Sequence, residues 1–123
     1  MTRTVFIGTG NIAAVHVESV AQLKDVDLVA VVDPARERAE AFAKKYGIPA
    51  VYSTIDDMIM AGGADVAHVL TPPATHFQIA RQLLEESFDV FLEKPMAETT
   101  EECESLTGIA QAKGRSLRVN QNF

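Results

Sequence analysis

The chain has 123 residues, of which 47% are hydrophobic and 23% are charged. This length and composition are typical of one compact globular domain, and they exclude a disordered segment. The net charge of −6 argues against nucleic-acid binding, because phosphate backbones are bound by clustered basic residues. The densest charge run here, residues 98–104, is acidic.

Short β-branched apolar runs alternate with amphipathic segments along the whole chain. The predicted strands are Thr4–Ile7, Leu28–Val32, Ala50–Tyr52, Val66–Leu70, Val90–Leu92 and Ser116–Val119. The predicted helices between them turn these apolar faces inward: Ile12, Val15, Val20 and Leu23; Ala35, Ala39, Phe42 and Tyr46; Phe77, Ala80, Leu83 and Leu84; Cys103, Leu106, Ile109 and Ala110. Strict alternation of strand and helix implies right-handed crossovers. It predicts an α/β fold, a Rossmann-type doubly wound parallel sheet in a single domain.

Targeting signals and metal-ligand patterns are not recognisable in the sequence. No apolar run reaches the roughly 18 residues of a membrane helix, and the N-terminal residues lack the parts of a signal peptide. The one cysteine, Cys103, cannot form an internal disulfide and has no histidine nearby. We expect a cytoplasmic protein with no membrane partner and no bound metal.

A glycine-rich loop follows the first predicted strand. Gly8-Thr9-Gly10-Asn11-Ile12-Ala13 matches the pattern in which one glycine permits a tight turn and the next lets backbone approach a pyrophosphate. The following helix directs its N–H groups and the positive end of its dipole to the phosphates. Any tight strand-to-helix turn also selects glycine. The loop therefore predicts dinucleotide binding only together with the acid on the next strand.

That acid is Asp33, which follows the second predicted strand. A carboxylate at this place accepts hydrogen bonds from the adenosine ribose hydroxyls and repels the 2′-phosphate of NADP. Two unit charges about 4 Å apart interact by ~1 kcal/mol in water and ~4 kcal/mol at an effective dielectric of 20. NAD is therefore expected rather than NADP, although Arg36 and Arg38 could hold a 2′-phosphate. Asp33 could also cap the helix after Pro34.

The segment Thr71-Pro72-Pro73 leads from the fourth predicted strand to a helix that begins near His76. Ligands bind at the carboxyl ends of parallel strands, so this backbone is expected to pass the ribose and nicotinamide of a cofactor. A neutral imidazole is expected at His76, because positive charge is unfavourable in a first helical turn. A structural histidine fits the pattern better than a catalytic one, and we interpret His16 and His68 as structural too.

Glu93-Lys94-Pro95 follows the fifth predicted strand, at the mouth of the same sheet. Lys94 could donate a hydrogen bond to a substrate oxygen and help to move the proton that accompanies hydride transfer. A lysine is a poor base at neutral pH unless it is desolvated or lies beside another cation, such as an oxidised nicotinamide ring. Composition alone favours the alternative, an exposed Glu-Lys pair before a proline turn.

Together these motifs resemble the N-terminal domain of the glucose–fructose oxidoreductase / inositol dehydrogenase (Gfo/Idh/MocA) family. The resemblance covers nearly all 123 residues. It rests on Gly8–Ala13, Val31–Asp33, Tyr46-Gly47, Thr71–Pro73 with His76, and Glu93–Ala97. The Glu-Lys-Pro sequence at this position is the family's most specific motif. It outweighs the interpretation of Glu93 and Lys94 as an exposed pair before a turn.

The resemblance implies an NAD(P)-dependent dehydrogenase that acts on a hydroxyl or carbonyl of a sugar, cyclitol or similar polyol. It implies that Lys94 is the catalytic-site lysine, in contact with the nicotinamide ribose and the substrate. The expected cofactor-binding set is Gly8, Gly10, Asn11, Ile12, Asp33, Thr71, Pro72, His76, Glu93 and Lys94.

Members of the family continue into a second α/β domain, which supplies another catalytic group, most of the sugar pocket and usually the oligomer interface. Residues 1–123 are therefore expected to form the dinucleotide-binding domain of a longer homo-oligomeric protein, without turnover of their own. The apolar residues at 55–60 could meet the second domain. Two alternatives stay open: a non-catalytic NAD-binding module (a sensor or partner subunit), or a lyase or glycosidase variant that holds NAD tightly.

Overall fold

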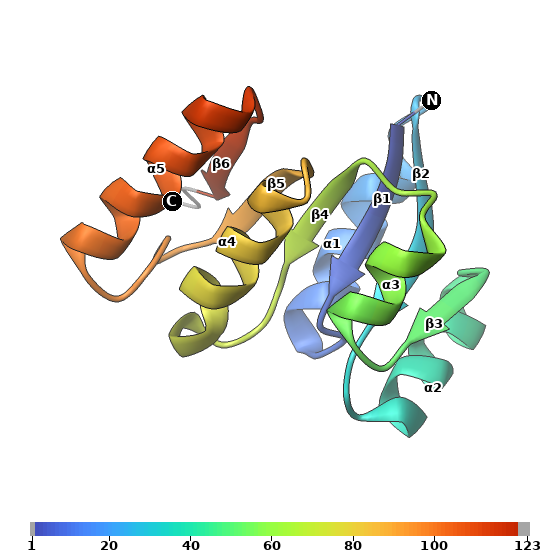
Figure 1. Ribbon diagram of the computed structural model, residues 1–123. Coiled ribbons are helices and arrows are strands. Elements are labelled where there is room, and N and C mark those ends of the chain that lie inside the picture. Colours follow the sequence, from blue (N-terminus) through green and yellow to red (C-terminus); the bar gives the residue numbers. More distant parts are fainter. Residues whose placement is uncertain (1, 121–123) are drawn as a thin grey trace.

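A computed structural model describes residues 2–120 as a parallel six-stranded sheet layered between helices (Figure 1). Residue 1 and residues 121–123 of the predicted domain lie outside this range. The strands are β1 (Thr2–Ile7), β2 (Val26–Val32), β3 (Ala50–Tyr52), β4 (Val66–Val69), β5 (Asp89–Glu93) and β6 (Leu117–Asn120). The helices are α1 (Asn11–Ala21), α2 (Arg36–Tyr46), α3 (Ile55–Ala61), α4 (His76–Glu85) and α5 (Thr100–Lys113), with a 3-10 turn at Pro73–Thr75.

The strand order β3-β2-β1-β4-β5-β6 confirms the doubly wound sheet predicted from the alternating pattern. The chain winds outward from β1 to β3 and then returns to β4 on the other side of β1. Right-handed crossovers place α1 and α2 on one face and α3, α4 and α5 on the other, as Figure 1 shows. The order reverses between β1 and β4, so their carboxyl ends flank a crevice.

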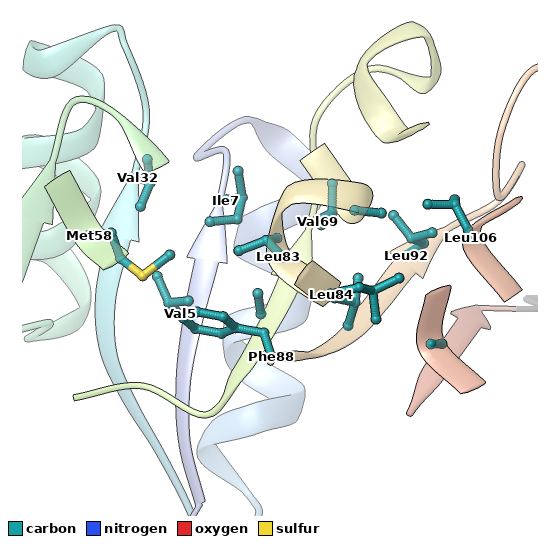
Figure 2. Close-up of a cluster of buried hydrophobic side chains, with 14 of the residues drawn as sticks. Val5, Ile7, Val32, Met58, Val69, Leu83, Leu84, Phe88, Leu92 and Leu106 are labelled. Carbon is teal, nitrogen blue, oxygen red and sulfur yellow. The ribbon is translucent and has the colours of Figure 1, made fainter. Parts of the chain in front are cut away.

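The sheet divides the hydrophobic core into two parts, because successive side chains of a strand point to opposite faces. Val5 and Ile7 of β1 pack under α3, α4 and α5. Phe6 between them packs under α1 and α2. Figure 2 shows the first part, where Leu83, Leu84 and Leu106 from the helices meet strand residues such as Val69 and Leu92.

The inward face predicted for the first helix was partly wrong. Val15 and Leu23 are 60% and 54% exposed, and the buried residues of α1 are Ala13, Val17 and Val20. Ala13, a small residue with no exposure, lets the helix lie close to the sheet. Val15 and Leu23 instead border a shallow hollow beside β4 and β5.

The helix α3 was not predicted from the sequence, although its start carries a recognisable signal. The Thr54 hydroxyl accepts a hydrogen bond from the Asp57 N–H at 3.1 Å, which is the contact of an N-cap. The helix ends at Gly62 and Gly63, both with positive φ. The apolar residues of α3 are not all available to a second domain: Met58 is buried in the core, whereas Met60 is 86% exposed.

The capping pattern predicted at the last helix is confirmed with one difference. The Thr99 hydroxyl accepts from the Glu102 N–H at 3.1 Å. The Glu102 carboxylate accepts from the N–H of Glu98, one residue before the N-cap. Gly114 ends α5 in the left-handed conformation, at φ 65°.

Replacement of Leu83 by alanine should lower the free energy of unfolding by about 2–5 kcal/mol, because the removed atoms leave a cavity in the fully buried core. Urea denaturation followed by circular dichroism measures this loss. The matched control is Leu23→Ala at a 54% exposed position, which should change the value by less than about 0.5 kcal/mol. Equal effects of the two substitutions would contradict the assignment of the core.

Candidate cofactor site

A cavity of about 680 Å³ opens at the carboxyl edge of the sheet, where the strand order reverses between β1 and β4. Ligands of doubly wound folds bind at such a reversal. Four connections line the cavity: those after β1, β2, β3 and β4. The predicted site residues that line it are Gly8, Gly10, Asn11, Ile12, Asp33, Thr71 and Pro72.

The two glycines of the loop meet different constraints. Gly8 has φ +100°, and a Cβ there would stand 3.1 Å from both the Leu70 carbonyl oxygen and the Thr71 Cγ2. Its small size therefore lets the β1 and β4 connections touch. A Cβ at Gly10 would meet nothing within 4 Å. Packing within the chain therefore does not explain the second glycine, which leaves open space at the cavity wall.

The N-terminus of α1 is a favourable place for an anion. Gly10 is the N-cap and has no side chain to accept hydrogen bonds, and the first turn contains no acidic residue. The Ala13 N–H donates to the Gly10 carbonyl oxygen at 3.0 Å. The earlier N–H groups of this turn and the positive end of the helix dipole can face an oxygen anion. Gly10, Asn11 and Ile12 all line the cavity at this point. The arrangement fits a bound pyrophosphate.

Asp33 also lines the cavity and is only 2% exposed. Its Oδ2 accepts hydrogen bonds from the Thr9 N–H at 3.0 Å, the Thr9 hydroxyl at 2.8 Å and Arg38 Nη2 at 2.7 Å. Its Oδ1 accepts from the Ala35 N–H at 2.9 Å, directly before α2. Asp33 therefore connects the glycine loop to the start of α2.

Two opposing effects act on the pKa of Asp33. Burial by itself raises the pKa, but the hydrogen bonds from Arg38, Ala35 and Thr9 outweigh burial and hold the pKa below its ordinary value of 3.8. The carboxylate is therefore charged at neutral pH.

Thr71 and Pro72 form part of the cavity wall at the end of β4, and their loop is tied internally. The Thr75 hydroxyl lies 2.6 Å from the Thr71 hydroxyl and 2.6 Å from the Pro72 carbonyl oxygen. This wall therefore has a defined shape.

His76 lies behind that wall and does not line the cavity; it is 1% exposed. Its Nδ1 is 2.8 Å from the Pro95 carbonyl oxygen and its Nε2 is 2.9 Å from the Thr71 carbonyl oxygen. These two contacts connect the ring to the segments that follow β4 and β5. No sequence pattern predicts the contacts of His76 with these two carbonyl oxygens.

Glu93 and Lys94 lie at the end of β5, outside the lining of the main cavity. Glu93 points to the face covered by α1, where its Oε2 is 3.4 Å from His16 Nε2. Lys94 is exposed, and the bond between Lys94 and Pro95 is cis. Glu93 and Lys94 therefore lie at the end of the strand next to β4, but neither residue lines the main cavity.

His16 and His68 lie in an aromatic group with Phe6 and Phe91 on the α1 face of the sheet. Burial and, to a smaller extent, the nearby His16 lower the pKa of His68 to about 4, although the Glu93 carboxylate partly opposes both. His68 is therefore neutral at physiological pH.

Several cavity residues were not predicted from the sequence. Ser53, Thr54 and Ile55 from the β3–α3 connection line the cavity. Arg38 of α2, one of the two arginines considered for a 2′-phosphate, lines it as well. The Thr54 N-cap pattern was the available signal, since it places a helix start, and hence a loop, after β3. Thr9 occupies a variable position of the glycine pattern, which does not reveal its bonds to Asp33.

The family model for "Oxidoreductase family, NAD-binding Rossmann fold" (GFO_IDH_MocA) matches residues 2–121. The chain belongs to this family. The match confirms the resemblance drawn from the glycine loop and Glu93-Lys94-Pro95. Nicotinamide-dinucleotide binding is the shared property of this Gfo/Idh/MocA domain.

Among curated Gfo/Idh/MocA relatives, D-glucoside 3-dehydrogenase of Escherichia coli K12 is 34% identical over 94% of this chain and 33% of its own length. The scyllo-inositol 2-dehydrogenase (NADP(+)) IolU of Bacillus subtilis 168 is 32% identical over 93% of this chain and 35% of its own. The crystal structure of GenD2 from gentamicin A biosynthesis in complex with NAD superposes with a TM-score of 0.94 at 30% identity, covering 99% of this chain and 35% of GenD2. The chain thus spans about a third of these relatives.

Within residues 2–120, no helix is long and apolar enough to cross a membrane. Within the same range, no three histidine, cysteine, aspartate or glutamate side chains gather as a metal site would require.

Replacement of Asp33 by alanine should lower the free energy of unfolding by roughly 2–3 kcal/mol at pH 7, because buried donors on Thr9 lose a charged acceptor. The folded-state pKa is depressed, so this contribution is present above the ordinary value near 3.8 and is lost as the pH falls below it. Urea titrations at pH 7 and pH 3 measure both parts.

The control for this substitution is Asp27→Ala on the same strand, where the side chain is exposed; it should change stability by less than about 0.5 kcal/mol. A deficit of the Asp33 variant that stays the same at pH 3 would contradict a stabilising role of the ionised carboxylate.

Proposed function

We propose that this chain binds NAD across the carboxyl edge of its sheet, as the cofactor domain of a dehydrogenase. The observation that carries the proposal is the open space beside Gly10, at a helix N-terminus with no side-chain cap and in the cavity that Asp33 also lines. An anion at the helix and a hydroxyl-bearing sugar at the carboxylate are the two parts of an adenosine diphosphate.

The proposed set of cofactor residues follows the cavity. Gly10, Asn11 and Ile12 hold the pyrophosphate through backbone N–H groups, and Asp33 accepts from the adenosine ribose. Gly8, whose own N–H donates to the Val32 carbonyl oxygen at 2.7 Å, keeps the loop close to the cofactor. Thr71 and Pro72 border the nicotinamide half. His76 supports this half from behind, through the Thr71 carbonyl oxygen. Glu93 and Lys94 complete the set from the adjacent strand. NAD is preferred over NADP because Asp33 is ionised.

When bound, NAD supplies a hydride acceptor at its nicotinamide ring. Lys94 is proposed as the catalytic residue, since it is an exposed cation at the end of β5. Its ammonium group can donate a hydrogen bond to the hydroxyl or carbonyl oxygen of the substrate. A neighbouring oxidised nicotinamide favours loss of the lysine proton, which allows Lys94 to accept the proton released from the hydroxyl.

The complete protein is proposed to act on a sugar, cyclitol or similar polyol in the cytoplasm. Support comes from relatives named as glucoside and inositol dehydrogenases. Residues 1–123 would form the dinucleotide-binding domain, and a further domain would supply the substrate pocket and a homo-oligomer interface. The chain length relative to its relatives supports this division. A non-catalytic module and a lyase or glycosidase variant are not favoured by these relatives.

Replacement of Gly10 by alanine should weaken NADH binding by at least about tenfold, or 1.4 kcal/mol, because the new methyl group enters the space proposed for the pyrophosphate. Stability should change by less than about 1 kcal/mol, since no protein atom lies within 4 Å of that position. Fluorescence titration of NADH and urea denaturation measure the two quantities.

The matched control is Gly108→Ala on α5, where an added Cβ also meets nothing within 4 Å. This variant should bind NADH as the original chain does. Unchanged NADH affinity of the Gly10 variant would overturn the placement of the pyrophosphate.

Replacement of Lys94 by alanine in the complete protein should abolish NAD-dependent oxidation of polyols while NADH affinity stays within a few-fold. The reason is that Lys94 takes part in proton transfer, whereas backbone N–H groups and Asp33 make most of the contacts with the cofactor. Steady-state kinetics and NADH titration separate the two roles. Lys113→Ala, on the exposed last turn of α5, is the control for loss of one positive charge. Undiminished turnover of the Lys94 variant would remove the catalytic assignment.

A further inference from the structure

Two mostly buried histidines contact the chain on either side of Lys94. His16 of α1 lies with its Nε2 3.4 Å from Oε2 of Glu93, the residue before Lys94. His76 of α4 lies with its Nδ1 2.8 Å from the carbonyl oxygen of Pro95, the residue after Lys94. Because α1 and α4 cover opposite faces of the sheet, the two histidines approach this segment from opposite sides (Figure 1). The exposed Lys94 thus lies between two neighbours that are each held by a histidine.

Aromatic packing fixes the direction of the His16 ring. The ring lies edge-on to three others, with centroid distances of 6.4 Å to Phe6, 6.0 Å to His68 and 5.9 Å to Phe91. The His16 side chain is only 13% exposed. Close packing of this kind limits the rotamers that a side chain can adopt. The ring therefore presents Nε2 to Glu93 in one direction.

The surroundings of the Glu93 carboxylate favour its contact with His16. The Glu93 side chain is 18% exposed, so solvent screens the contact only in part. A carboxylate only accepts hydrogen bonds, and the contact is favourable when His16 carries a proton on Nε2. His68, the other imidazole near this carboxylate, is neutral at physiological pH because its pKa is lowered to about 4, and it adds no competing charge. His16 therefore restrains the Glu93 side chain.

We propose that His16 is a positioning residue for Lys94. Through Glu93 it holds the end of β5 against α1, the helix that begins at the proposed pyrophosphate position, so that the Lys94 ammonium group stays beside the nicotinamide. The inference rests on the proposed function and deepens it. Misplacement of a reacting group by about 1 Å can lower a rate by about a hundredfold. The contact is therefore expected to affect turnover more than cofactor affinity.

The test compares two replacements of His16 in the complete protein, by steady-state kinetics of NAD-dependent polyol oxidation and by NADH titration. His16→Phe keeps an aromatic ring and loses the N–H donor, whereas His16→Gln keeps a donor and loses the ring. The phenylalanine variant should lower kcat by about tenfold or more, while the KM for NAD and the NADH affinity stay within about threefold. The glutamine variant should keep kcat within about threefold of the original value.

The matched control is His68→Phe, the same replacement in the same aromatic group. Nδ1 of His68 is buried without a hydrogen-bond partner among residues 2–120, so this variant should leave kcat unchanged. In a Glu93→Ala background, His16→Phe should lower kcat no further, because the residue through which His16 acts is gone. A higher kcat in the phenylalanine variant than in the glutamine variant would show that packing alone matters and would overturn the role of His16. Equal losses in the two variants would overturn it as well.

A second measurement does not require turnover. Acetylation by N-hydroxysuccinimidyl acetate, followed by peptide mass spectrometry, gives the reactivity of Lys94 relative to Lys113 in the NADH complex. His16→Phe should raise this ratio by about twofold or more, since the amine is no longer held against the cofactor, and His16→Gln should leave it unchanged. The same ratio in all three proteins would contradict the positioning of Lys94 by His16. Failure of the original protein to bind NADH would instead overturn the proposed function.

Discussion

The Asp33 carboxylate joins the end of β2 to the glycine loop and to the start of α2, and the geometry of the site depends on these bonds. Thr9 brings two donors from the loop, Ala35 brings one from the start of α2, and Arg38 brings one from within it. Because Asp33 also lines the cavity, a single side chain both fixes the glycine loop and forms part of the wall of the candidate site. The folding of the loop and the shape of the site are therefore linked at this residue.

The sequence predicted the sheet well because the information there is local. Each strand is a short β-branched run, and strict alternation with helices leaves few topologies. The missed helix α3 is short, and its apolar residues divide between the core and solvent: Met58 is buried and Met60 is exposed. The wrong inward residues of α1 have a similar cause. Periodicity identifies an apolar stripe, but Ala13 shows that close approach to the sheet, rather than side-chain size, selects the buried face.

The site was predictable where a backbone requirement shows in the residue type, as at Gly8, Gly10 and Asp33. Its remaining parts depend on pairs far apart in the chain. Glu93 of β5 contacts His16 of α1, and His76 contacts Pro95, which lies nineteen residues later in the chain. Arg38 was visible only as one of two nearby arginines, and the structure distinguishes it from Arg36 by its partner. Such pairings follow from the folded arrangement, and no local pattern encodes them.

The two carbonyl contacts of His76 have a consequence for how this position can change over evolutionary time. From a buried position, one imidazole ring contacts two carbonyl oxygens, at 2.8 and 2.9 Å. One of these oxygens belongs to the segment after β4 and the other to the segment after β5. Position 76 is thus restricted by a steric and hydrogen-bonding requirement of its own. A substitution there would disturb two loops of the sheet edge together, whether or not a ligand is bound.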